Sequence, residues 1–182
     1  MKFIHLSDLH LGKKLNEFSM LEDQRYILDQ ILRIIEEQNA DAVMIAGDIY
    51  DKPVPPGSAV KLFDSFITSI AEMGIKAFII SGNHDSAERL SFGSNIMKSE
   101  GIYFSQVYEG HTEPIILNDE YGRVSVYLLP FLKPAQVRPF FPDIPVETYE
   151  DAVLAAVSEA HVNESMRSII VSHQFVTGAV TS

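Results

Sequence analysis

The chain has 182 residues, 46% of them hydrophobic, with no cysteine and a formal net charge of −11. This length suits one catalytic domain, and the absence of thiols excludes disulfides and thiolate metal sites, so any metal must be held by oxygen and imidazole ligands. The acidic balance is the wrong sign for binding nucleic acid through bulk electrostatics, and no apolar run is long enough for a membrane span or a signal peptide, so we expect a cytoplasmic protein.

Short apolar runs rich in Val and Ile predict buried, parallel strands at 2–7, 42–46, 76–81 and 168–172. Between the first three runs, apolar residues recur at helical spacing over 21–35 and 60–70. The first part of the chain is therefore predicted to be a β-α-β-α-β unit whose right-handed crossovers place the helices on the sheet faces.

The pattern changes in the second half of the chain. The predicted elements there are a short helix at 92–99, strands at 102–104, 114–117 and 123–129, a hairpin turn at 118–122 and a helix at 149–162. Five prolines punctuate residues 130–145, which are also rich in Phe and Leu. We interpret that stretch as an ordered surface excursion rather than a flexible linker.

A polar cluster follows each of the strands predicted to be buried: Asp8-Leu9-His10, Gly47-Asp48, Gly82-Asn83-His84-Asp85 and Ser172-His173. Each cluster taken alone is a weak signal, because such short combinations occur often by chance. Ligand sites of open α/β sheets, however, lie beyond the carboxyl ends of the strands, where all of these clusters are placed. Their shared position predicts a single functional site.

The residue types in these clusters suit a pair of divalent ions. Two ions about 3.5–4 Å apart can clamp a phosphate ester and activate a water molecule, and they need a bridging carboxylate, for which Asp48 is the natural candidate. Asp8 and His10 point the same way because they lie two residues apart. An amide oxygen from Asn83 and an imidazole from His173 suit Mn²⁺, Fe²⁺ or Zn²⁺ better than an all-oxygen site for Mg²⁺ or Ca²⁺.

Residues next to these ligands are given other roles. Neighbours on an extended segment cannot both face one metal, so His84 is assigned to the substrate, as a proton donor to the leaving oxygen or a stabiliser of phosphoryl charge. Asp51 and Asp85 either orient site residues or serve turns and helix caps. His5 is assigned to the sheet face, and Tyr149 to anchoring the proline-rich excursion rather than stacking on bases.

Some basic residues follow the polar clusters closely and could attract an anionic substrate despite the negative net charge. Lys13 and Lys14 follow the first cluster, Lys52 the second and Arg89 the third. Scattered surface charges would explain each of them equally well.

In this order, the clusters within Ser7–Gly12, Gly47–Asp51, Gly82–Asp85 and Ser172–His173 resemble the calcineurin-like metallophosphoesterase superfamily. Within it, the run from Asp48 through Asp51-Lys52-Pro53 and the segment Leu129–Pro134 are similar to the SbcD-type DNA nucleases. The resemblance covers essentially the whole chain.

The resemblance implies an α/β/β/α sandwich with Asp8, His10 and Asp48 on one Mn²⁺ ion, Asp48, Asn83 and His173 on the other, and His84 as the catalytic residue. It implies Mn²⁺-dependent double-strand exonuclease and single-strand endonuclease activity on DNA ends during break processing. It also implies a homodimer formed through helices of this domain and an SbcC-type ATPase partner.

The family pattern continues beyond His173 to a Gly-His-x-His segment and a capping region, neither of which occurs in residues 174–182. We therefore expect 1–182 to be a truncated nuclease domain that lacks the last strands of the sandwich, binds metal weakly and has little activity. Calorimetric titration with Mn²⁺ tests this, and binding as tight as in a chain extended through the missing histidines would contradict it. Two alternatives stay open: a phosphoesterase for a small phosphoester, and a non-catalytic scaffold of the same fold.

Overall fold

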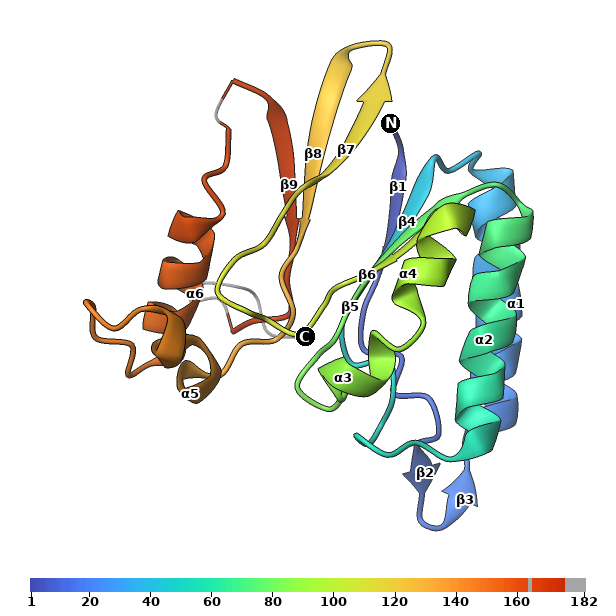
Figure 1. Cartoon of the computed structure of the whole chain (residues 1–182). Coiled ribbons are helices and arrows are strands. Elements are labelled where there is room, and N and C mark those ends of the chain that lie inside the picture. The colour runs from blue at the N-terminus through green and yellow to red at the C-terminus, as the bar shows by residue number, and fades with distance from the viewer. Residues whose placement is uncertain (164, 176–182) are drawn as a thin grey trace.

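The computed structural model describes residues 1–163 and 165–175, and its two larger sheets face each other between outer helices (Figure 1). In chain order the elements are β1 (Phe3–Leu6), β2 (Lys14–Leu15), β3 (Phe18–Ser19), α1 (Leu21–Glu37), β4 (Ala42–Ala46), α2 (Gly57–Glu72), β5 (Lys76–Ile80), α3 (Ala87–Leu90), α4 (Ser94–Met97), η1 (Lys98–Glu100), β6 (Ile102–Phe104), β7 (Ile115–Asp119), β8 (Gly122–Leu128), α5 (Pro134–Val137), η2 (Arg138–Phe140), α6 (Tyr149–Glu159) and β9 (Arg167–Val171).

The first sheet has the strand order β1-β4-β5-β6, and all of its pairs are parallel. Helices α1 and α2 lie side by side on one face of this sheet (Figure 1). They bury apolar residues at helical spacing, such as Ile35 in α1 and Phe63 and Ile70 in α2, against the strand residues Val43 and Ile79. The β-α-β-α-β unit predicted from the sequence is confirmed.

The second sheet has the order β7-β8-β9, with β7 antiparallel and β9 parallel to β8. The β7–β8 hairpin is confirmed, with a turn tighter than the predicted 118–122. The run 168–172 forms β9, which pairs with β8 and therefore belongs to the second sheet. It does not join the other predicted parallel strands in the first sheet. The prediction that this strand is buried is wrong as well, because only Val171 of β9 is buried in the structure. A run of Val and Ile has the same composition in either sheet and in a strand with one open face, so the sequence pattern could not distinguish these cases.

The space between the sheets is filled by apolar side chains from both of them. Phe78 and Ile80 of β5 pack in one cluster with Val126 and Leu128 of β8, and all four are buried. Phe78 also stacks on Tyr103, with ring centroids 5.3 Å apart and ring planes inclined by 10°. Helices α5 and α6 lie beyond the second sheet (Figure 1), which gives the α/β/β/α layering that the resemblance implied.

Smaller elements depart from the sequence prediction. The helix expected at 92–99 is two short pieces, α4 and η1, and Gly93 before α4 has the positive φ of 76° that begins a new helical segment. The proline-rich stretch is ordered, as predicted, and contains α5 and η2. In the part of the chain that the structure describes, no helix combines the length and the apolar character needed to cross a bilayer.

Candidate metal centre

The loops that follow β1 and β4 bind each other through their backbones. The amide of Asp8 donates to the carbonyl oxygen of Gly47 at 3.1 Å, and the amide of His10 donates to that of Asp48 at 2.9 Å. Asp8, His10 and Asp48 have φ values of 56°, 43° and 50°. Such left-handed conformations are uncommon for non-glycine residues and concentrate at functional sites, where the surrounding structure enforces them.

Gln24 at the start of α1 fixes the first of these loops. Its side-chain nitrogen donates to the carbonyl oxygen of His10 at 2.7 Å, and its side-chain oxygen accepts from the amide of Gly12 at 3.0 Å. Gln24 was not predicted as a site residue, because a glutamine that binds only backbone atoms belongs to no recognisable motif. Through these bonds it ties the position of His10 to the first turn of a helix.

Asp48 lies at the centre of the site with only 3% of its surface exposed. Its Oδ1 accepts a hydrogen bond from the amide of His84 at 2.9 Å. Its Oδ2 lies 3.7 Å from His10 Nε2 and 3.5 Å from His173 Nε2, which are too far for hydrogen bonds. The carboxylate thus faces two imidazole nitrogens without being bonded to either.

His173 approaches Asp48 from the second sheet, two residues after the end of β9. Its Nδ1–H donates to the carbonyl oxygen of Ala46 at 2.7 Å. This bond fixes the tautomer and leaves Nε2 as the free ligand atom, which is the arrangement that metal-binding histidines commonly use. The predicted ligand His173 therefore follows a strand of the second sheet, and its free Nε2 faces Asp48.

Two groups of side chains in the described residues can each hold an ion: His10, Asp48 and His84 in one, and Asp8, Asp48 and His173 in the other. Asp8 Oδ1 also lies 3.7 Å from His10 Nε2, so those two residues can share an ion as well. Ligand atoms about 2.0–2.2 Å from one ion are separated from each other by ~3–4 Å. The donor set and its spacing fit divalent metals, with Asp48 common to both groups.

Asn83 and His84 both line one cavity of about 590 Å³ together with Asp8, His10 and His173. The expectation that they face apart assumed an extended segment, but the chain bends over residues 83–85. The exposed His84 donates from Nδ1 to the carbonyl oxygen of Asp51 at 3.0 Å. Its ring meets that of His10 edge to face, with centroids 4.9 Å apart.

Asp85 holds the loops after β4 and β5 together. Its carboxylate accepts from the backbone amides of Ile49, Tyr50 and Gly82 at 2.9–3.1 Å. Burial raises the pKa of the Asp85 carboxyl, while these backbone donors act in the opposite direction. Of the two roles left open by the sequence, positioning of the site loops is the one that these bonds support for Asp85.

Several residues on the cavity wall were not assigned to the site from the sequence, among them His5 and Phe131. His5, which was placed on the sheet face, is exposed and lines the cavity, as does Phe131. For His5 a signal existed, because it alternates along the first strand with Ser7, another cavity residue. For Phe131 the only signal was its place in the segment Leu129–Pro134.

Two glycines lie where site residues pack directly against the backbone: Gly47 against His173, and Gly82 against Asp48. A Cβ on Gly47 would lie 2.7 Å from Cγ of His173, and Gly47 has a φ of +83°. A Cβ on Gly82 would overlap the backbone nitrogen and Oδ1 of Asp48. The Gly-Asp and Gly-Asn-His-Asp clusters therefore need glycine for close packing around the proposed ligands.

The chain is similar in sequence to known proteins over its whole length. A family model described as calcineurin-like phosphoesterase matches residues 1–162. The SbcD subunits of the SbcCD nuclease from Staphylococcus saprophyticus and Staphylococcus epidermidis are each 35% identical to the chain over 185 aligned residues. Those alignments cover 100% of this chain, including His173, and 48% of each relative. The chain thus spans about half the length of the curated relatives it matches.

Proposed function

The chain belongs to the calcineurin-like phosphoesterase family, and on this premise we propose that it forms a two-metal centre that hydrolyses phosphodiester bonds at DNA ends. The observation that carries this proposal is the position of Asp48. Its buried Oδ2 lies between His10 of one sheet and His173 of the other. A buried carboxylate is stable when a cation balances it, and two histidine nitrogens complete a metal site rather than a salt bridge.

We assign five metal ligands to this centre. Asp8 and His10 share one ion with Asp48, and Asn83 and His173 share the other with Asp48. This division follows the family resemblance. The spacing of Asp8, His10, Asp48 and His173 supports one shared centre, in which Asp8 also lies close enough to His173 to bind the same ion. The mixed oxygen and nitrogen donor set favours Mn²⁺ over Mg²⁺ or Ca²⁺. When bound, such ions polarise the phosphoryl group and lower the pKa of a water nucleophile.

His84 is proposed as the catalytic residue. Because its Nδ1–H is engaged by the carbonyl oxygen of Asp51, Nε2 is the atom that can exchange a proton or donate one to the leaving oxygen. The same bond orients the ring beside His10 at the cavity. Asp51 is therefore a positioning residue, and its own carboxylate lies 3.8 Å from His10 Nδ1.

Replacing His84 by Ala is expected to lower kcat for an oligonucleotide about 10²–10⁴-fold, the usual contribution of a general acid or base. Hydrolysis is measured at a saturating Mn²⁺ concentration, so that weak metal binding does not limit the rate. Mn²⁺ affinity, measured by calorimetry, is expected to change little. His111→Ala, at an exposed loop position outside the cavity, is the matched control. An undiminished rate in His84→Ala would contradict the assignment.

A second candidate is a phosphoesterase that acts on a small substrate, and the net charge of −11 favours it. The exposed Lys13, Lys14, Lys52 and Arg89 near the site loops favour DNA instead. Comparing rates on a single-stranded oligonucleotide, a blunt duplex and 4-nitrophenyl phosphate separates the candidates. A non-catalytic scaffold, the third possibility, would hydrolyse none of them.

We also propose two partners: an SbcC-type ATPase, which the relatives' name SbcCD suggests, and a second copy of the chain, which the family resemblance implies. Exposed Phe92 lines an apolar groove of about 310 Å³ between α2 and the α3–α4 segment, and exposed Ile96 precedes the groove residue Met97 in α4, which supports association through helices. We expect sedimentation to show a dimer that the double variant Phe92→Asp, Ile96→Asp dissociates. A monomeric wild-type chain at micromolar concentration would contradict this part of the proposal.

A further inference from the structure

The segment Leu129–Pro134 spans the edge where the two sheets meet. The amide of Leu129 donates to the carbonyl oxygen of Val171 at 3.0 Å, at the end of β9 in the second sheet. The amide of Phe131 donates to the carbonyl oxygen of Ser81 at 2.9 Å, just after β5 in the first sheet. The segment that carries Phe131 is therefore anchored to both sheets beside the carboxyl ends that precede Asn83 and His173.

The ring of Phe131 forms part of the cavity wall. Its centroid is 6.4 Å from that of His173, with planes inclined by 67°, and 5.8 Å from that of Tyr149, with planes inclined by 44°. Neither neighbour stacks parallel on the ring, and Phe131 is partly exposed and lines the cavity. Tyr149 and His173 thus fix the ring of Phe131, whose apolar face has no role in the proposed metal binding or proton transfer.

We infer that Phe131 is a stacking platform for the base next to the scissile phosphate. This inference rests on the proposed function, because it needs a phosphodiester held beside His173. Stacking on an aromatic ring suits every base, since each has a π-face, and it requires no hydrogen bonds to base edges. The cavity of about 590 Å³ has the size of a small-ligand site.

Stacking in this cavity also restricts the kind of DNA that the site accepts. A base paired within a duplex is covered by its neighbours, so it must leave the stack before it can lie on Phe131. The preferred substrate is therefore an unpaired nucleotide, in a single strand or at a frayed end. A small phosphoester without a base gains nothing from Phe131.

The test uses a dinucleotide with 2-aminopurine 5′ to thymidine, because stacking on an aromatic ring quenches the emission of 2-aminopurine. The probe is titrated with the chain, both with EDTA and with Ca²⁺, so that the signal reports binding and not cleavage. We expect quenching with the wild type and with Phe131→Tyr. We expect about tenfold weaker binding and loss of quenching with Phe131→Leu and Phe131→Met.

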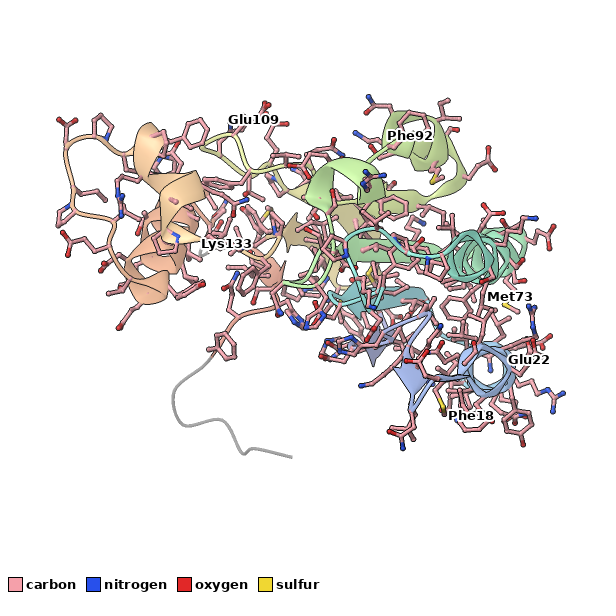
Figure 2. All side chains as sticks on the ribbon, turned by 90° about the horizontal axis from the view of Figure 1, so that it is seen from below. Phe18, Glu22, Met73, Phe92, Glu109 and Lys133 are labelled. Atoms are coloured by element: carbon pink, nitrogen blue, oxygen red, sulfur yellow. The ribbon has the colours of Figure 1, made fainter. Side chains whose placement is uncertain are left out.

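Phe18→Leu is the matched control, since Phe18 is 78% exposed and lies far from Lys133, two residues beyond Phe131 (Figure 2). Thermal unfolding shows whether each variant is folded, and the two apolar replacements at 131 provide independent chances of a folded protein. Unchanged quenching in a folded Phe131→Leu or Phe131→Met, or no binding by the wild type, would overturn the inference. Failure of the proposed hydrolysis appears separately, as absence of Mn²⁺-dependent cleavage by the wild type.

Discussion

Replacing Gly82 by Ala is expected to lower the free energy of unfolding by about 3 kcal/mol or more and to abolish Mn²⁺ binding. The added Cβ would overlap the backbone nitrogen and Oδ1 of Asp48. The backbone nitrogen cannot rotate away, and turning Oδ1 away would break the hydrogen bond that it accepts from the His84 amide. Relief therefore requires the loops after β4 and β5 to separate, which moves the proposed bridging ligand out of place.

Gly57→Ala is the matched control for this change. Gly57 opens α2, and a Cβ there has no atom within 4 Å among the described residues. Alanine at an unstrained helical position is neutral or stabilising by up to ~1 kcal/mol. In a domain of this size 3 kcal/mol corresponds to a fall in Tm of about 6–12 °C. Equal melting temperatures and equal Mn²⁺ affinities for the two variants would contradict the packing argument.

The sequence predicts those site residues whose position depends only on the local pattern of apolar residues and on the geometry of a parallel sheet. Apolar runs locate the strand ends, and parallel strands in one sheet bring their carboxyl ends to one edge. This rule is enough to bring Asp8, His10, Asp48 and Asn83 together from the sequence alone. It works because each of these residues closely follows a strand of the first sheet.

The parts that the sequence could not supply depend on long-range pairing or on backbone atoms. His173 reaches the site because β9 pairs with β8 in the opposite sheet, with Val126 opposite Ile169. Nothing in an apolar run specifies that partner. Gln24 acts on carbonyl and amide groups, which nearly every residue possesses, so its role has no signature in the spacing of side chains.

Replacing Asp48 by Asn is expected to leave the metal-free chain as stable as the wild type or up to about 2 kcal/mol more stable. Asparagine has the same shape, and its Oδ1 can still accept from the amide of His84. The variant removes a negative charge that has almost no contact with solvent, because only 3% of the surface of Asp48 is exposed. A binding site commonly sacrifices stability in this way, because the charge that a metal needs is unfavourable when the metal is absent.

The same variant should lose the stabilisation that Mn²⁺ gives. At a metal concentration 100 times Kd, binding to the native state alone stabilises the wild type by about 2.7 kcal/mol. Asp48→Asn should gain little, because a neutral amide replaces the carboxylate shared by both proposed ions. Asp29→Asn, on the exposed side of α1, should behave as the wild type does. Urea unfolding with and without Mn²⁺ measures both effects, and a full metal response in Asp48→Asn would show that this carboxylate does not bridge the ions.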